Sequence, residues 1–82
     1  MNEETLVAKI HDILKEQGRT EEEIAEIDKA YQFAKKLHAG QYRVSEEPYI
    51  IHPCEVALIL ADLHVDKHTI MAAFLHDVIE DT

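Results

Sequence analysis

Apolar residues recur at spacings of three and four along most of this 82-residue chain, and glycine or proline residues interrupt the pattern. Such spacing places apolar side chains on one face of an α-helix, whereas a half-buried strand alternates apolar and polar residues. Gly18 and Gly40 each follow a periodic stretch, as expected of residues that end helices. The sequence therefore predicts an all-α fold of about four helices, with no strands.

The first two predicted helices cover residues 4–17 and 21–39. Thr20 and Glu23 have the spacing of a capping box, which predicts that the second helix starts just after Thr20. His38 lies in the last turn of this helix, and we interpret it as a residue satisfied locally rather than as a ligand. The apolar residues that keep the helical period in these two helices are Leu6, Val7, Ile10, Ile13, Leu14, Ile24, Ile27, Tyr31, Ala34 and Leu37.

The periodicity breaks down between Gly40 and His52, in a segment that reads as an ordered loop. Proline disfavours the α conformation in the residue before it, so Glu47 and His52 are expected to be extended. Pro53 suits the first position of a helix, which makes His52 the predicted N-cap of a third helix that reaches Leu63. The side chains expected to point inward from this helix are Val56, Ile59, Leu60 and Leu63.

The fourth predicted helix begins after Asp66, a favourable N-cap residue, and leads into a cluster of polar side chains. Residues four apart share a helix face, so His76 stacks above Glu80, and Asp77 stacks above Asp81. Polar groups that emerge together from an apolar helix need a compensating partner. Imidazole and carboxylate ligands suit manganese, iron or zinc, so the cluster predicts a metal site, with a solvated helix end as the alternative.

Composition narrows the range of partners and compartments. The chain has 17 acidic and 8 basic residues, and its net charge of −9 disfavours binding to nucleic acid or to an anionic membrane. Cys54, the single cysteine, cannot form an internal disulfide and fits a reducing compartment. No apolar stretch approaches the length of a membrane span, and the acidic N-terminus does not resemble a signal peptide. We therefore expect a cytoplasmic protein.

Three segments together resemble a known family: residues 30–43, residues 47–53, and residues 74–82. The sequence resembles the HD superfamily of metal-dependent phosphohydrolases. More narrowly, it resembles the hydrolase domain of the Rel/Spo homologues, which degrades the alarmones ppGpp and pppGpp in the stringent response. A bare His-Asp pair is weak support for such a resemblance. A loop that ends in His-Pro and is followed by His-Asp-x-x-Glu-Asp-Thr is much more specific.

The resemblance implies a helical HD-type domain, with residues 1–82 as its N-terminal portion. It implies hydrolysis that releases pyrophosphate from the ribose 3′ position of (p)ppGpp. His52, His76 and Asp77 are then the metal ligands, and Glu80 and Asp81 act on the attacking water. Mn²⁺ is the implied ion, with another divalent cation as the alternative.

The loop before the third helix carries the implied substrate contacts. Arg43 and Ser45 fall where the family's loop packs against the guanine base, and Tyr49 falls where that loop supports the site. Val44 and Glu46 depart from the Lys and Gly that the family commonly has at these positions. Losing a cation and adding a carboxylate is expected to weaken binding of a polyanionic substrate.

The family's fourth metal ligand is an Asp on a later helix, which residues 1–82 do not include. We therefore expect a C-terminally incomplete domain that is inactive in this form. Two other functions stay open: a different HD-type nucleotide phosphohydrolase, and a non-catalytic helical module that self-associates. We also expect a homodimer or higher oligomer, because four helices cannot cover every large apolar side chain; those in question are Leu58, Ile59, Leu63, Phe74 and Ile79.

Overall fold

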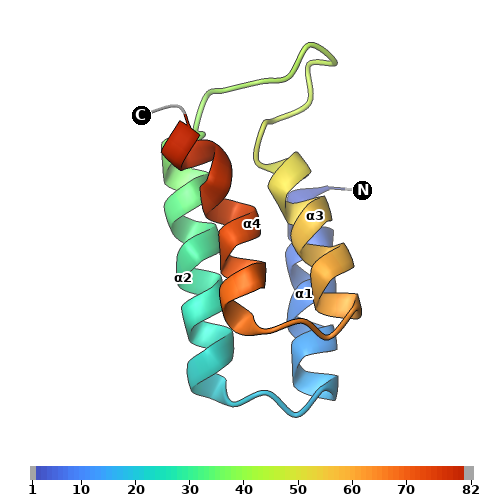
Figure 1. Cartoon of the computed structure of the whole chain (residues 1–82). Coiled ribbons are helices and arrows are strands. Elements are labelled where there is room, and N and C mark those ends of the chain that lie inside the picture. The colour runs from blue at the N-terminus through green and yellow to red at the C-terminus, as the bar shows by residue number, and fades with distance from the viewer. Residues whose placement is uncertain (1, 81–82) are drawn as a thin grey trace.

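The computed structural model describes residues 2–80, and within them the side chains of residues 2–76. The described residues form four helices (Figure 1), which are α1 (Glu3–Glu16), α2 (Glu21–Leu37), α3 (Ile51–Asp62) and α4 (Lys67–Glu80). Tyr42 and Pro48 form an isolated antiparallel bridge, and no strand occurs within residues 2–80. The predicted all-α fold of about four helices is confirmed.

Local sequence signals set most of the helix ends. Thr20 caps α2, where its side-chain oxygen accepts a hydrogen bond from the Glu23 N–H at 3.1 Å. Asp66 likewise accepts a bond from the Thr69 N–H at 3.3 Å at the start of α4. Gly18, with φ +73°, adopts the left-handed conformation just beyond the C-cap of α1. These predicted caps are confirmed.

The start of α3 differs from the prediction. The helix begins at Ile51 with Ile50 as its N-cap, so His52 is neither the N-cap nor extended. The turn before the helix runs directly into it, with the His52 N–H donating to the Tyr49 carbonyl at 3.2 Å. The first N–H groups of a helix have no intrahelical acceptor, so Pro53 fits in the first turn without the loss of a hydrogen bond.

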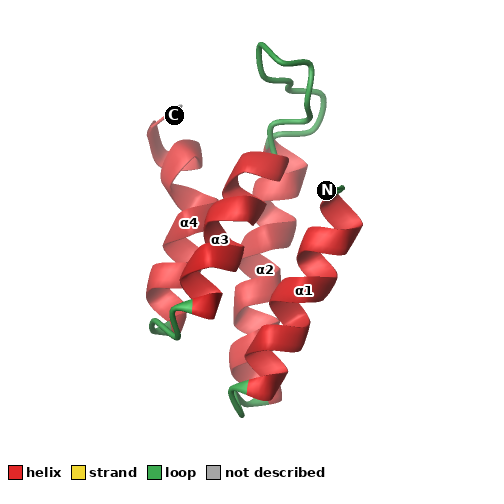
Figure 2. Cartoon of the chain, turned by 90° about the vertical axis from the view of Figure 1, so that its right-hand side faces the viewer, coloured by secondary structure: helices red, strands yellow, loops and turns green. Residues whose placement is uncertain are grey.

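The four helices pack as two pairs. α2 packs mainly against α4 and α1 against α3, while α3 and α4 join the two pairs (Figures 1 and 2). The short α1–α2 and α3–α4 connections lie at one end of the bundle. The 38–50 loop, the start of α3 and the end of α4 lie at the opposite end. This topology brings the turn that contains His52 and the turn that contains His76 to the same end of the molecule.

The core lies between these helix pairs, and α3 turns an unexpected face toward it. Cys54, Ala57 and Ala61 are fully buried, whereas Ile59 and Leu63 are 62% and 65% exposed, so their predicted inward orientation is wrong. This helix is apolar on most of its surface, so the spacing of its apolar residues allows either face to be buried. Small side chains allow α3 to approach α1 and α4 closely. The buried apolar residues of the other helices are Leu6, Ile10, Leu14, Ile27, Ala30, Tyr31, Ala34, Ile70, Ala73 and Phe74.

Two side chains tie together the connections at the far end of the bundle. The Gln17 Nε2 donates to the Ala61 carbonyl at 2.6 Å, linking the end of α1 to α3. The guanidinium of Arg19 donates to the carbonyl of Val65 and to Gln17 Oε1. The Arg19 side chain is only 7% exposed, so these bonds are shielded from water. They hold the end of the bundle that is opposite the predicted site.

Candidate metal and nucleotide site

Two of the three predicted metal ligands come from helix ends that meet at one end of the bundle. His52 is half-buried in the first turn of α3, and His76 is exposed in the last turns of α4. The His76 Nδ1 lies 3.0 Å from the Ala73 carbonyl, to which it donates. Because a carbonyl oxygen can only accept, this bond places a ring proton on Nδ1. Metal-binding histidines are commonly oriented in the same way, so the ring suits an ion.

The other predicted residues of the polar cluster lie where their side chains are not described. Asp77 and Glu80 belong to α4, which confirms that this part of the cluster is helical. Their side chains, and Asp81 as a whole, lie outside the described residues. Among the side chains of residues 2–76, no group of three or more His, Cys, Asp or Glu residues is arranged to hold a metal. The convergence of His52, His76 and Asp77 therefore stays a prediction.

The implied substrate-binding residues lie on a small hairpin within the 38–50 loop. The Arg43 N–H donates to the Glu47 carbonyl at 2.9 Å, and the Glu46 N–H donates to the Arg43 carbonyl at 2.8 Å. Arg43 and Ser45 are exposed at the tip, where they line an open hollow of about 540 Å³ together with Val44. A ligand can therefore reach both side chains from solvent.

The hairpin contains one residue in an unfavourable backbone conformation. Glu46 has φ +68°, in the left-handed region, after the turn that starts at Arg43. A hairpin of this kind usually places glycine at the left-handed position. A residue with a Cβ costs about 1–2 kcal/mol in that conformation. The departure at Glu46 therefore affects loop stability as well as charge.

The base of the hairpin is organised by a buried histidine. His38 is 5% exposed, its Nδ1 lies 2.9 Å from Gln41 Oε1, and its ring lies 4.5 Å from the ring of Tyr49, centroid to centroid. The predicted local satisfaction of His38 is confirmed for its Nδ1 but not for its Nε2, which is buried without a hydrogen-bond partner among the described residues. The contact with Tyr49 was not anticipated from the sequence, because only the folded loop brings the two rings together. Tyr49, half-buried, lies at the foot of the hairpin rather than at its tip.

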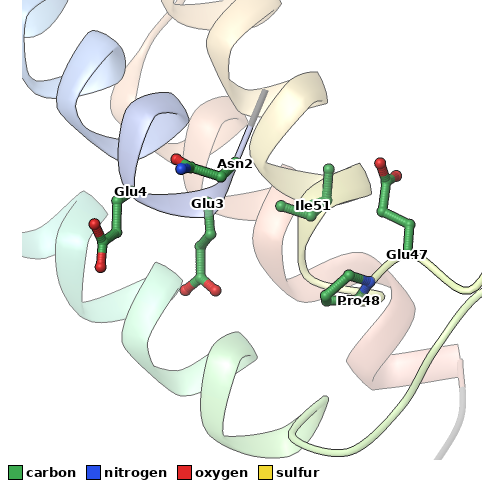
Figure 3. Close-up of a pocket in the computed structure, with 6 residues that line it drawn as sticks. All are labelled: Asn2, Glu3, Glu4, Glu47, Pro48 and Ile51. Carbon is green, nitrogen blue, oxygen red and sulfur yellow. The ribbon is translucent and has the colours of Figure 1, made fainter.

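A second hollow lies beside the same loop but has the wrong charge for a nucleotide. It has a volume of about 580 Å³, and Figure 3 shows that its lining comes from the start of α1 and from Glu47, Pro48 and Ile51. Three carboxylates line it, those of Glu3, Glu4 and Glu47. Glu3 is engaged by the Tyr31 hydroxyl and by the Lys35 ammonium at 3.3 Å. An acidic hollow repels a polyanion, so we do not assign it to the substrate.

Neither of the two buried groups with strongly raised pKa values is a candidate base or nucleophile. Burial raises the pKa of the Cys54 thiol to about 12, with a smaller contribution from the Glu3 carboxylate. Burial also raises the pKa of Tyr31, and its hydrogen bond to Glu3 raises it further. Both groups therefore remain protonated at neutral pH and serve the core.

Comparison with known proteins gives the family. The family model described as "HD domain" matches residues 30–82, more than half of the chain. The chain is 60% identical over 57 residues, 70% of its length, to the guanosine-3′,5′-bis(diphosphate) 3′-pyrophosphohydrolase of Aquifex aeolicus, of which the match covers 8%. It is 55% identical over 62 residues, 76% of its length, to the bifunctional (p)ppGpp synthase/hydrolase SpoT of Escherichia coli, covering 9% of that protein.

A third relative extends the same group. The GTP pyrophosphokinase rsh of Brucella ovis is 54% identical over 56 residues, which cover 68% of this chain and 8% of that protein. The chain thus spans less than a tenth of the length of these relatives. The described helices match the all-helical fold expected of this family. No helix within residues 2–80 is both long enough and apolar enough to span a membrane. The chain belongs to the HD domain family, as its resemblance to the Rel/Spo hydrolase domains predicted.

Proposed function

We propose that this chain is the N-terminal portion of a cytoplasmic, metal-dependent hydrolase domain that cleaves the 3′-pyrophosphate of (p)ppGpp. The observation that carries most weight is the 60% identity over 57 residues to a protein named as such a hydrolase. The topology adds support, because the turns that contain His52 and His76 lie at one end of the bundle. The Nδ1–H donation from His76 to the Ala73 carbonyl orients an imidazole as a metal ligand requires.

The proposed roles follow the chemistry of the side chains. His52, His76 and Asp77 hold a divalent cation, for which Mn²⁺ is our choice. When bound, the cation supplies a Lewis acid at the phosphoryl group. Glu80 and Asp81 orient the attacking water and accept its proton.

The hairpin supplies the substrate contacts in the same proposal. Arg43 offers a planar cation to the guanine base or to a phosphate, and Ser45 offers a hydroxyl. Tyr49 supports the hairpin from its base, where it contacts His38. The exposure of Arg43 and Ser45 supports these roles, because both side chains are accessible to a ligand.

Metal binding is the direct test of this function. We expect the 82-residue chain to bind Mn²⁺, as measured by the relaxation of water protons, and we expect His52→Ala and His76→Ala each to weaken binding strongly. His68→Ala is the matched control, because His68 is exposed in the first turn of α4 at the opposite end of the bundle. Equal Mn²⁺ affinity in all three variants would contradict the ligand assignment.

Hydrolysis needs a second experiment. The family resemblance implies four protein ligands for the metal, and residues 1–82 supply three of them, namely His52, His76 and Asp77. We expect the 82-residue chain alone to release no pyrophosphate from ppGpp. Exchanging the matched 57 residues of the Aquifex aeolicus hydrolase for those of this chain should preserve hydrolysis. Adding His52→Ala to that chimera should abolish it. A folded but inactive chimera would argue instead for another nucleotide substrate, and hydrolysis by the chain alone would contradict its inactivity.

Self-association is a further part of the proposal, and exposed apolar side chains favour it. Ile59 and Leu63 are more than half exposed on α3, and Phe33 and Leu37 are 52% and 43% exposed on α2. Burying a large apolar side chain contributes about 1.5–3 kcal/mol, which favours a homodimer or higher oligomer. The net charge of −9 opposes assembly, so we expect sedimentation to show stronger association as salt is raised. A monomer at every salt concentration would contradict this part.

A further inference from the structure

His38 is held in one orientation by its neighbours. Its Nδ1 lies 2.9 Å from Gln41 Oε1. The Gln41 Nε2 donates to the Leu37 carbonyl at 3.4 Å, which fixes the amide so that its oxygen faces the imidazole. The oxygen can only accept, so the imidazole proton lies on Nδ1. The His38 ring therefore has a defined tautomer as well as a defined position.

The same ring holds the two legs of the hairpin together. It packs on Tyr49, with the ring planes inclined by 33°. The Gln41 N–H donates to the His38 carbonyl at 2.9 Å, and the Tyr49 N–H donates to the Gln41 carbonyl at 3.0 Å. His38, Gln41 and Tyr49 form a closed unit, which we call the hairpin clamp. Every other residue of the hairpin, including Arg43, lies between Gln41 and Tyr49.

The hairpin clamp is connected directly to the turn that carries His52. The Tyr49 carbonyl accepts the His52 N–H at 3.2 Å, and the Pro48 carbonyl accepts the Ile51 N–H at 3.1 Å. Ile50 and Ile51 are buried, so this turn cannot rotate without disturbing the core. A displacement of Tyr49 would therefore move the backbone of His52.

A purely structural role explains the position of His38 but not its chemistry. The Nε2 is buried and has no hydrogen-bond partner among the described residues. Buried acceptors are nearly always satisfied, and an unpaired one calls for an explanation. A phenylalanine would stack on Tyr49 without leaving a buried nitrogen unpaired. The imidazole combines the stacking with the bond to Gln41.

We infer that His38 is a positioning residue, which acts through Tyr49 to set the place of His52 and of the Arg43 hairpin. The inference rests on the proposed function in one respect, namely that His52 is a metal ligand. His38 itself contacts neither the ion nor the substrate in this account.

Two substitutions separate the two contacts of His38. His38→Asn keeps a donor for Gln41 but loses the ring, and His38→Phe keeps the ring but loses the donor. We expect each to lower the Mn²⁺ affinity of the 82-residue chain by about tenfold, the lower end of the effect of residues that orient metal ligands. We also expect faster hydrogen exchange at the Tyr49 N–H and a shifted imidazole NMR signal for His52. His68→Asn is the control and should change none of these.

The outcomes distinguish this inference from the proposed function. Unchanged Mn²⁺ affinity in both His38 variants, together with loss of binding in His52→Ala, would overturn the positioning role. If the unsubstituted chain binds no Mn²⁺, the metal site of the proposed function fails. The Tyr49 exchange rate and the His52 signal, measured without metal, then decide on His38. If both are unchanged in the variants, the positioning role is overturned as well.

Discussion

The two phenylalanines of this chain lie in opposite environments and provide a matched test of the packing. Phe74 of α4 is 2% exposed and packs edge-to-face on Tyr31 of α2, with ring centroids 5.7 Å apart. Phe33 of α2 is 52% exposed. Substitution of each by alanine removes the same atoms from a helix, so the difference between them reports tertiary packing.

The structure sets the expected magnitudes. Phe74→Ala should lower the free energy of unfolding by about 3–5 kcal/mol, because it removes a buried ring and leaves a cavity. Phe33→Ala should lower it by less than about 1 kcal/mol, because half of that ring is already in water. At about 0.05–0.15 kcal/mol per residue, a domain of this size has a total stability of roughly 4–12 kcal/mol, so Phe74→Ala removes much of it.

Urea unfolding followed by circular dichroism measures both variants. Phe74→Leu is included as a milder variant, because Phe74→Ala removes much of the total stability. It keeps most of the apolar volume and should cost about 1–2 kcal/mol. Equal costs for Phe33 and Phe74 at low protein concentration would refute the packing described here. A Phe33→Ala cost that grows with protein concentration would instead place Phe33 in a self-association interface.

Three further predictions concern pH, backbone strain and substrate binding. Burial raises the pKa of the Cys54 thiol from 9.0 to about 12 in the folded protein. Burial of the neutral thiol therefore contributes its full stabilisation below pH 9, and this stabilisation is lost as the pH rises toward 12. Between pH 8 and pH 10, urea unfolding should show the unsubstituted chain losing about 1 kcal/mol more than Cys54→Ala, and equal losses would contradict the burial of the thiol. His64 has φ +58° just beyond the C-cap of α3, so His64→Gly should raise the free energy of unfolding by about 0.5–1 kcal/mol in the same assay, and a decrease would contradict strain there. In the chimera with the Aquifex aeolicus hydrolase, Arg43→Ala should raise KM for ppGpp without changing the Mn²⁺ affinity. Glu46→Gly should lower KM, because it removes a carboxylate and relieves the backbone strain at φ +68°. An unchanged KM in both variants would show that the hairpin is not part of the substrate site.

The local features of the fold could be predicted from the sequence, because their causes lie within a few residues. Helical spacing gave the number and type of elements, and single capping side chains such as Thr20 and Asp66 gave the helix starts. The family resemblance also came from short segments, and it named every candidate site residue before the fold was known. The convergence of His52, His76 and Asp77 stays a prediction, because the side chain of Asp77 lies outside those described.

Contacts between distant residues were decided only by the tertiary structure. The apolar spacing of α3 allows either of two helix faces to be buried. Close packing against α1 and α4 selected the face with small side chains, which includes Cys54 and Ala57, and left Ile59 exposed. Pro53 predicted the wrong helix start, because the turn through Tyr49 carries the chain into α3 two residues early. The contact of His38 with Tyr49 depends on closure of the hairpin that separates them, and no periodic pattern encodes it. Periodicity and capping are short-range properties, whereas the choice of buried face and the pairing of distant rings depend on how all the elements fill one volume.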